Sequence, residues 1–135
     1  MVSRHSLLPA VALFLAACSG KSPASVADKF VDRYYVEFDQ TAALPLTDGV
    51  AKQRLHAEIQ LVGGARNGIA QGSHAARVYY QRSSLSVTGA SARADYKLQI
   101  IPQGGSEIGR DVQLELTEQA DRSWRVVRFT ETTPR

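Results

Sequence analysis

Apolar residues recur at helical spacing between residues 26 and 38. A helix through this stretch has one apolar side and one charged side. The apolar side holds Val26, Ala27, Phe30, Val31, Tyr34 and Phe38. Pro23 suits the first turn of a helix, and a neighbouring serine can cap its free N–H groups. We therefore predict an amphipathic helix that begins near Ser22 or Ser25 and runs through Phe38.

A second helical stretch follows a short interruption. Pro45 disfavours helix at the residue before it, and Thr47 can act as a new N-cap. From about residue 48 to residue 62 the apolar positions again form one stripe, made of Ala51, Leu55, Ile59 and Val62. Four glycines between residues 63 and 74 then end the helical pattern. A loop of this length is unusual in a compact domain, so it is either a lid or hides a short element.

From Arg77 onward apolar and polar residues alternate, which is typical of strands with one buried face. Residues 92–100 and 108–116 alternate cleanly, whereas residues 77–88 change phase as a bulged strand does, and residues 123–131 form a last strand. The buried positions of the two clean strands are Ala92, Ala94, Tyr96, Leu98, Ile100, Ile108, Val112, Leu114 and Leu116. We predict an α+β fold, with N-terminal helices packed on a curled four-stranded antiparallel sheet.

Charge selects the register of the hairpin that joins the two clean strands. In one register Lys97 lies beside Asp111, and Arg93 lies beside Glu115, on the outer face of the sheet. The competing register sets Asp95 against Asp111, and like charges in opposite positions destabilise a strand pair. We therefore predict the first register.

The first seventeen residues differ in character from the rest of the chain. Arg4 and His5 precede an apolar stretch at residues 7–17, and this stretch ends directly before Cys18, the only cysteine. The order is that of a secretory signal peptide. The apolar stretch is too short to span a bilayer, which takes about 20 residues in a helix. We therefore expect residues 1–17 to be removed.

The residues Leu15-Ala16-Ala17-Cys18 resemble the lipobox of bacterial lipoproteins. In that family a lipid is joined to the cysteine thiol, cleavage falls before the cysteine, and the new amino terminus is acylated. Two or three acyl chains anchor a protein stably where one is marginal. The resemblance implies lipid attachment at Cys18 and, because no aspartate follows the cysteine, a location on the periplasmic face of a Gram-negative outer membrane. The alternatives are an ordinary periplasmic signal with an incidental cysteine, or a buried cysteine of the fold.

This interpretation divides the chain into a signal peptide (residues 1–17), a lipidated cysteine with its spacer (18–24), and a single α+β domain (25–135). The order of elements in the domain, together with the closing segment "DRSWRVVRF", resembles the nuclear transport factor two-like, or cystatin-like, superfamily. A clear third helix of the family pattern is missing. The resemblance implies a cone-shaped cavity between helices and sheet, and often a homodimer through the outer face of the sheet. It implies no single chemistry, since one fold hosts many functions.

The composition argues against several kinds of partner. The net charge is +3, but the lysines and arginines are spread singly along the chain, so we expect no nucleic-acid partner. The three histidines, His5, His56 and His74, do not cluster with each other or with the cysteine, so we expect no metal. Nothing in the sequence indicates a cofactor.

Enzymes of the superfamily use an Asp, a His or a Tyr at the bottom of the cone. The residues predicted to face the cavity and to contact a ligand are Tyr34, Tyr80, Tyr96, Arg110 and Arg128. No carboxylate falls on the inward face of the two clean strands, so the general base that proton abstraction needs is missing there. We therefore favour a non-catalytic module that binds a periplasmic protein or a small ligand. The alternatives are a small isomerase or dehydratase that uses the cavity, and a structural envelope subunit whose cavity is filled by its own side chains.

Arg110 and Arg128 interrupt the apolar alternation of their strands and are predicted to point toward the helices. If Leu116 pairs with Trp124 in the last hairpin, the two arginines become diagonal neighbours. Two buried guanidinium groups need anionic partners. Either each reaches the rim or pairs with a helix carboxylate such as Glu37, or the two form an anion site at the cavity mouth for a carboxylate or phosphate.

The lipobox interpretation predicts the fate of a Cys18→Ala chain. Without the thiol no lipid can be attached, so the chain should remain an unlipidated precursor or a soluble periplasmic protein. Metabolic labelling with a fatty acid, followed by membrane fractionation, measures this. A Cys18→Ala chain that is still acylated and recovered with the outer membrane would contradict the interpretation.

Overall fold

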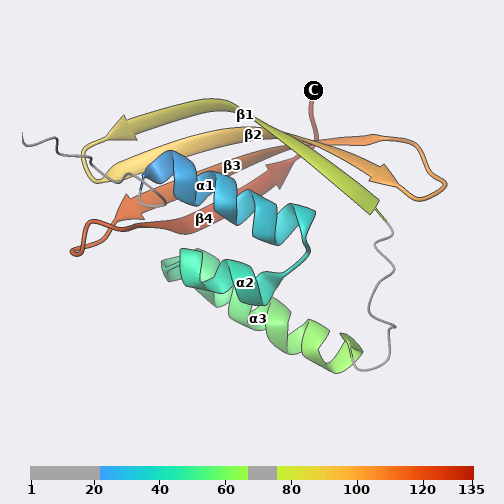
Figure 1. Cartoon of the computed structure of the whole chain (residues 1–135), viewed down its shortest axis with the longest axis horizontal. Coiled ribbons are helices and arrows are strands. Elements are labelled where there is room, and N and C mark those ends of the chain that lie inside the picture. The colour runs from blue at the N-terminus through green and yellow to red at the C-terminus, as the bar shows by residue number, and fades with distance from the viewer. Residues whose placement is uncertain (1–21, 67–75) are drawn as a thin grey trace, which may run out of the picture.

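The computed structural model describes residues 22–66 and 76–135. The predicted signal peptide, Cys18, His5 and His74 lie outside these residues. The elements in chain order are α1 (Pro23–Val31), η1 (Asp32–Val36), α2 (Gln40–Ala43), η2 (Leu44–Leu46), α3 (Gly49–Arg66), β1 (Ala76–Thr88), β2 (Ser91–Pro102), β3 (Ile108–Glu118) and β4 (Trp124–Thr132). The helices cover one face of a curled antiparallel sheet with strand order β1-β2-β3-β4 (Figure 1), so the predicted α+β fold is confirmed.

The start of α1 follows from its sequence. The Ser25 N–H donates to the Ser22 hydroxyl oxygen at 3.1 Å, and Pro23 occupies the first turn, where its missing N–H costs nothing. The predicted apolar side of the helix is buried as far as Val31.

The helix then departs from the prediction. Residues Asp32–Val36 form a π-helical turn, and the Glu37 N–H donates to the Asp32 carbonyl at 2.9 Å. The wider turn shifts the helical phase, so Tyr34 and Tyr35 both pack against the core. The prediction that Phe38 lies on the buried side was wrong, because the helix ends before it: Phe38 has φ 54° and is 42% exposed.

A short helix, α2, occupies the stretch that the sequence patterns left without an element. Asp39 caps it by accepting from the Ala42 N–H at 2.9 Å. The Thr47 hydroxyl donates to the Leu44 carbonyl instead of capping α3, so the predicted N-cap was wrong. α3 continues through the two glycines at which we predicted its end.

The register of β2 and β3 is as predicted, with Lys97 beside Asp111 and Arg93 beside Glu115. The Lys97 ammonium lies 3.5 Å from the Asp111 carboxylate. The phase change in the first strand is also confirmed, because a bulge interrupts the β1–β2 ladder at Ser83.

The last hairpin differs from the prediction. Leu116 pairs with Val126 rather than with Trp124, and a bulge at Val127 shifts the register before Arg128. The extra residue reverses which side chains face inward. Phe129 is therefore buried, whereas Arg128 points to the outer face, so its predicted orientation toward the helices was wrong.

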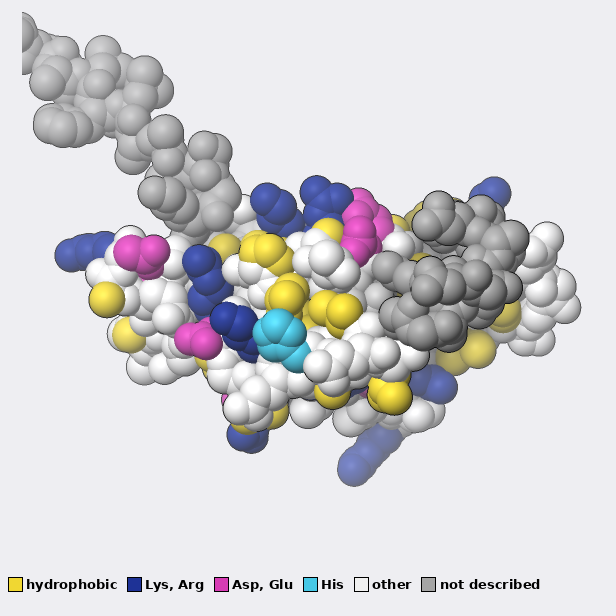
Figure 2. Space-filling view, turned by 90° about the horizontal axis from the view of Figure 1, so that it is seen from below, with side chains coloured by type: hydrophobic (Ala, Val, Ile, Leu, Met, Phe, Trp, Pro, Cys, Tyr) yellow, Lys and Arg dark blue, Asp and Glu magenta, His cyan; other side chains and the backbone are white. Residues whose placement is uncertain are grey.

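Apolar side chains fill the middle of the cone. The Phe30 ring lies 5.0 Å from the Phe129 ring and 5.5 Å from the Tyr34 ring, measured between centroids. Apart from the aromatic residues Tyr96 and Trp124, Thr47 has the only buried polar side chain among those that the structure describes. Hydrophobic groups are also visible between basic groups on the helix side (Figure 2). The space available to a ligand therefore lies at the mouth rather than at the centre.

Candidate functional site

A pocket of about 320 Å³ opens at the mouth of the cone, where η1, α3 and the end of β4 meet the sheet. Its lining combines aromatic, aliphatic and charged side chains: Tyr34, Tyr35, Phe38, Gln40, Arg54, Leu98, Ile100, Arg110 and Glu131. We refer to it as the mouth pocket. Its volume matches the lower end of the range for small-molecule sites.

Arg54 on α3 organises one wall of the mouth pocket. Its guanidinium donates to the Glu58 carboxylate at 3.0 Å and to the Glu131 carboxylate at 3.1 Å. A third donor reaches the Phe129 carbonyl at 3.1 Å, and the guanidinium carbon lies 4.0 Å from the centre of the Phe129 ring. One side chain thus joins α3 to β4 by charge-assisted hydrogen bonds and a cation–π contact.

Two tyrosines of η1 complete this network. The Tyr34 hydroxyl donates to the Glu58 carboxylate at 2.8 Å, and the Tyr35 hydroxyl donates to the Glu131 carboxylate. Burial, reinforced by the hydrogen bond to a carboxylate, raises the pKa of both hydroxyls above the ordinary tyrosine value. Both therefore stay protonated and act as hydrogen-bond donors to carboxylates that Arg54 already holds.

Arg110 faces the mouth pocket from β3, as predicted, but its guanidinium is not part of the network. Within the described residues it donates to the Gly109 carbonyl at 2.8 Å, and no ion pair forms. The carboxylate proposed for it from the sequence, Glu37, pairs instead with Arg33 at 2.7 Å. Arg110 is thus a half-buried cation beside aromatic side chains, with donors left for an anion.

The other predicted ligand residues lie away from the mouth pocket. Tyr96 is buried in the core and donates to Asp28, which also accepts from Arg82 at 2.9 Å. Tyr80 lies on the edge strand β1, with its ring centroid 6.0 Å from that of Tyr96 on β2. Arg128 lies 3.9 Å from Glu115 on the outer face. The structure therefore brings Tyr34 and Arg110 to one site and leaves the other three elsewhere.

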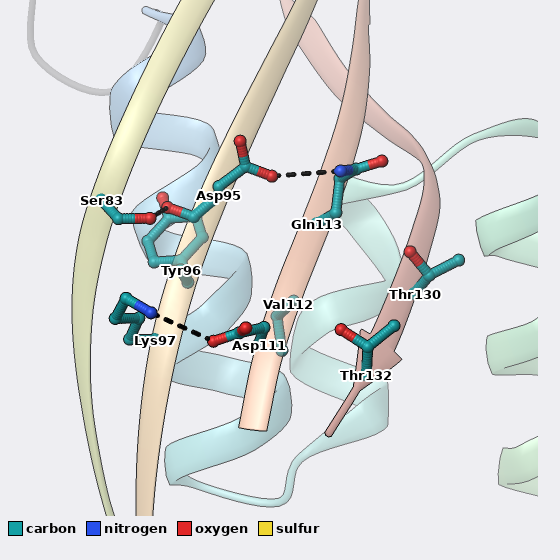
Figure 3. A pocket seen from close by; sticks show the side chains of 9 residues that line it. All are labelled: Ser83, Asp95, Tyr96, Lys97, Asp111, Val112, Gln113, Thr130 and Thr132. Carbon is teal, nitrogen blue, oxygen red and sulfur yellow. Dashed lines mark hydrogen bonds and ion pairs between the residues drawn. The ribbon is translucent and has the colours of Figure 1, made fainter. Parts of the chain in front are cut away.

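A second hollow, of about 350 Å³, lies on the face of the sheet turned away from the helices (Figure 3). Asp95 accepts from the Gln113 amide at 3.2 Å, and Asp111 faces Lys97. Asp95 and Asp111 point outward as predicted, so neither can serve the mouth pocket. Lys97 and Gln113 face the two carboxylates across the strands, although the buried Oδ1 of Asp111 accepts no hydrogen bond from the described residues.

Sequence reasoning missed most of the mouth network. Arg54 and Glu58 are four residues apart, so their ion pair could have been read from helical spacing. Glu131 could not be placed, because the β4 bulge decides which side chains face inward. Among the described side chains, no group of three or more His, Cys, Asp and Glu residues is placed to hold a metal ion.

The raised pKa of Tyr34 predicts a loss of stability at high pH. Above about pH 10 the unfolded chain releases the phenolic proton while the folded chain keeps it, so this contribution is present below pH 10 and is lost as the pH rises. Between pH 9 and pH 11 the free energy of unfolding should fall more in the wild type than in Tyr34→Phe, by up to about 1.4 kcal/mol before solvent screening. Urea titrations at several pH values measure the free energy of unfolding of each chain. An equal fall of this free energy with pH in the wild type and in Tyr34→Phe would contradict the network.

Comparison with known proteins supports the fold through structure alone. No protein-family model and no curated protein matches the sequence. In the part of the chain that the structure describes, no helix has both the length and the apolar character needed to cross a membrane.

Several solved structures are similar over most of this chain. A ketosteroid isomerase-like protein from Erwinia carotovora has a TM-score of 0.58 at 12% identity, covering 83% of this chain and 93% of its own. A protein of unknown function with a cystatin-like fold, from Nostoc punctiforme, has a TM-score of 0.54 at 9% identity, covering 82% and 87%. The soluble domain of TrwG, from the type IV secretion machinery of Bartonella grahamii, has a TM-score of 0.53 at 12% identity, covering 81% and 90%. The chain therefore has the nuclear transport factor two-like, or cystatin-like, fold.

Proposed function

We propose that this chain is a lipid-anchored, non-catalytic binding or assembly module on the periplasmic face of the Gram-negative outer membrane. Its binding site is the mouth pocket, and its ligand presents an acidic group beside an apolar or aromatic body. The acidic group belongs either to a small molecule or to a partner protein.

The observation that carries this proposal is the position of Arg110. Its guanidinium lies on the mouth pocket, where the Gly109 carbonyl is its only acceptor among the described residues. Tyr34, Tyr35 and Phe38 supply aromatic surface around the same space. A carboxylate can accept two parallel hydrogen bonds from such a guanidinium. An aromatic or aliphatic body would then replace water against the apolar lining.

The carboxylates of the mouth support binding rather than catalysis. Glu58 accepts from Tyr34 on both oxygens and from Arg54 on Oε1. Glu131 accepts from Tyr35 and from Arg54 on Oε1. Among the described residues, Oε2 of Glu131 is the one oxygen of these two carboxylates that is left without a hydrogen-bond donor. A general base must reach the proton that it abstracts with an oxygen that is free to accept it. The isomerase or dehydratase alternative would therefore need Glu58 to release its partners, or the remaining oxygen of Glu131 to act as the base.

The anchor and the assembly role rest on different grounds. The lipobox at residues 15–18 supports lipid attachment, and the short spacer that follows would hold the domain close to the membrane. The likeness to the soluble domain of TrwG, at 12% identity, shows that this fold also serves in a secretion machine. A membrane-held module that presents its mouth pocket to a partner agrees with both.

Thermal shift with phenylacetate tests the proposed site. Phenylacetate joins a carboxylate to an aromatic ring, so it should raise the melting temperature of the wild type in a concentration-dependent way. Arg110→Met should abolish that rise and leave the melting temperature of the free protein within a few degrees, because Arg110 forms no ion pair among the described residues.

Two controls make the result specific. Arg128→Met removes an arginine from the outer face and should leave the stabilisation by phenylacetate intact. Phenylacetamide, which keeps the shape of phenylacetate but not its charge, should stabilise the wild type at least tenfold less effectively by concentration. No thermal shift with any carboxylate or phosphate, or an equal loss in Arg110→Met and Arg128→Met, would overturn the proposed site.

A further inference from the structure

The two edges of the sheet differ in the hydrogen bonds that they receive from the described residues. At the β4 edge, Thr47 forms a parallel bridge with Val126, and the Asp48 N–H donates to the Val126 carbonyl at 2.9 Å. At the β1 edge, no hydrogen bond from the described residues reaches the backbone groups that point away from β2. β1 is also the longest strand, with 13 residues. Such an open edge is a template for pairing with another strand.

The end of β1, residues 84–88, lacks the features that usually protect an edge. Its sequence, Ser-Leu-Ser-Val-Thr, contains no charge, glycine or proline and lies beyond the bulge at Ser83. Leu85 and Val87 lie on the helix-side face, opposite the buried residues Ala94 and Ala92, yet they are 36% and 50% exposed. The described residues therefore leave apolar surface uncovered beside an edge backbone to which they donate no hydrogen bond.

The turn after β1 decides which backbone groups are free. Gly89 has φ 59° and begins a two-residue turn between Thr88 and Ser91. In such a hairpin the two residues that flank the turn exchange hydrogen bonds, and bonded and non-bonded pairs then alternate along the ladder. The N–H and C=O groups of Leu85 and Val87 consequently point away from β2, at the same two residues whose side chains are exposed.

We propose that this edge pairs with the same edge of a second copy of the chain. A twofold axis at Ser86 sets Leu85 opposite the partner's Val87, and Val87 opposite the partner's Leu85. Both pairs then join outward-pointing backbone groups, so they form the hydrogen-bonded positions of an antiparallel ladder. The two β1 strands would join the two sheets into one, and the four exposed apolar side chains would cover one another.

The segment can pair with a second copy of itself without electrostatic repulsion. No charged residue falls within 84–88, so the antiparallel register brings no like charges together. A register centred on Leu85 would set each Val87 opposite the bulge at Ser83, and one centred on Val87 would set each Leu85 opposite Gly89 in the turn. Ser86 is therefore the only centre that matches both the free backbone groups and the apolar side chains.

The symmetry is also compatible with anchoring. A twofold axis perpendicular to the sheet leaves the helices of both copies on the same side, and α1 begins near β1, since Arg82 donates to the Ala24 carbonyl at 3.5 Å. Two lipid anchors could then enter one membrane, which would raise the effective concentration of a small and otherwise weak interface. This step rests on the proposed anchoring, whereas the strand pairing does not.

A disulfide trap tests the register. In the full chain carrying Cys18→Ala, which has no other cysteine, Ser86→Cys places two thiols at a non-hydrogen-bonded pair with Cα atoms about 4.5 Å apart. Thr88→Cys is the matched control, because the two Thr88 positions lie about 14 Å apart in this register. Mild oxidation should give at least about tenfold more disulfide dimer with Ser86→Cys than with Thr88→Cys, measured on non-reducing gels.

A second measurement separates pairing from other uses of the edge. Val87→Lys places a charge in each hydrogen-bonded pair and should shift the sedimentation of the chain from dimer to monomer, whereas Val50→Lys, at a similarly exposed position on α3, should not. Equal cross-linking at residues 86 and 88, or a monomeric wild type, would overturn the proposal. A third contradicting outcome is a monomeric wild type whose binding to phosphatidylethanolamine–phosphatidylglycerol vesicles is weakened by Val87→Lys. The edge would then contact lipid rather than a second copy of the chain. The chain lacks Cys18, so a failure of lipid anchoring cannot produce these outcomes.

Discussion

The contacts of Arg54 hold together the part of this molecule in which its chemistry lies. Three chain segments meet at the cone mouth without sharing a strand ladder or a helix: η1 with Tyr34, α3 with Glu58, and the end of β4 with Glu131. The guanidinium contacts all three, since it also lies 3.5 Å from the Tyr34 hydroxyl. Without it, two carboxylates would remain close to each other and partly shielded from water, which is costly.

This arrangement separates stability from binding within one small domain. The middle of the cone is filled by Phe30, Phe129 and their neighbours, so burial of apolar surface there stabilises the fold. Polar groups collect at the mouth. Solvent there reduces the cost of a group such as Arg110, which has no anionic partner among the described residues. Phe38 stands at the same rim with φ 54°, a conformation that costs a side chain about 1–3 kcal/mol. Its backbone strain is thus placed beside the pocket.

Local patterns in the sequence predicted what local physics determines. The buried side of α1 and the alternation in β2 and β3 follow from helical and strand periodicity, and the charge pair Lys97–Asp111 chose the register. The π-helical turn leaves no mark in this pattern. The β4 bulge does change the apolar phase, from Trp124 and Val126 to Phe129, but this change was not interpreted as a bulge. Both changes fall on residues of the site.

The candidate site was accordingly predicted only in part. Arg110 lies in a regular stretch of β3, so strand alternation placed it correctly at the mouth. Arg128 follows the bulge, so the same reasoning placed it on the wrong face. Glu131 was missed for the same reason, and its partner Arg54 is 77 residues away in the sequence. A contact between residues so far apart in the sequence depends on the tertiary fold, so the spacing of residues within a helix or strand cannot predict it.

Hydrogen exchange in an Arg54→Met chain tests most directly whether this one side chain holds the mouth together. Methionine keeps much of the apolar stem but none of the donors, so the amides of η1 and of the last residues of β4 should exchange faster, while those of β2 and β3 in the filled part of the cone keep the wild-type rate. Unchanged exchange at η1 and β4, or an equal increase across the whole sheet, would contradict the account.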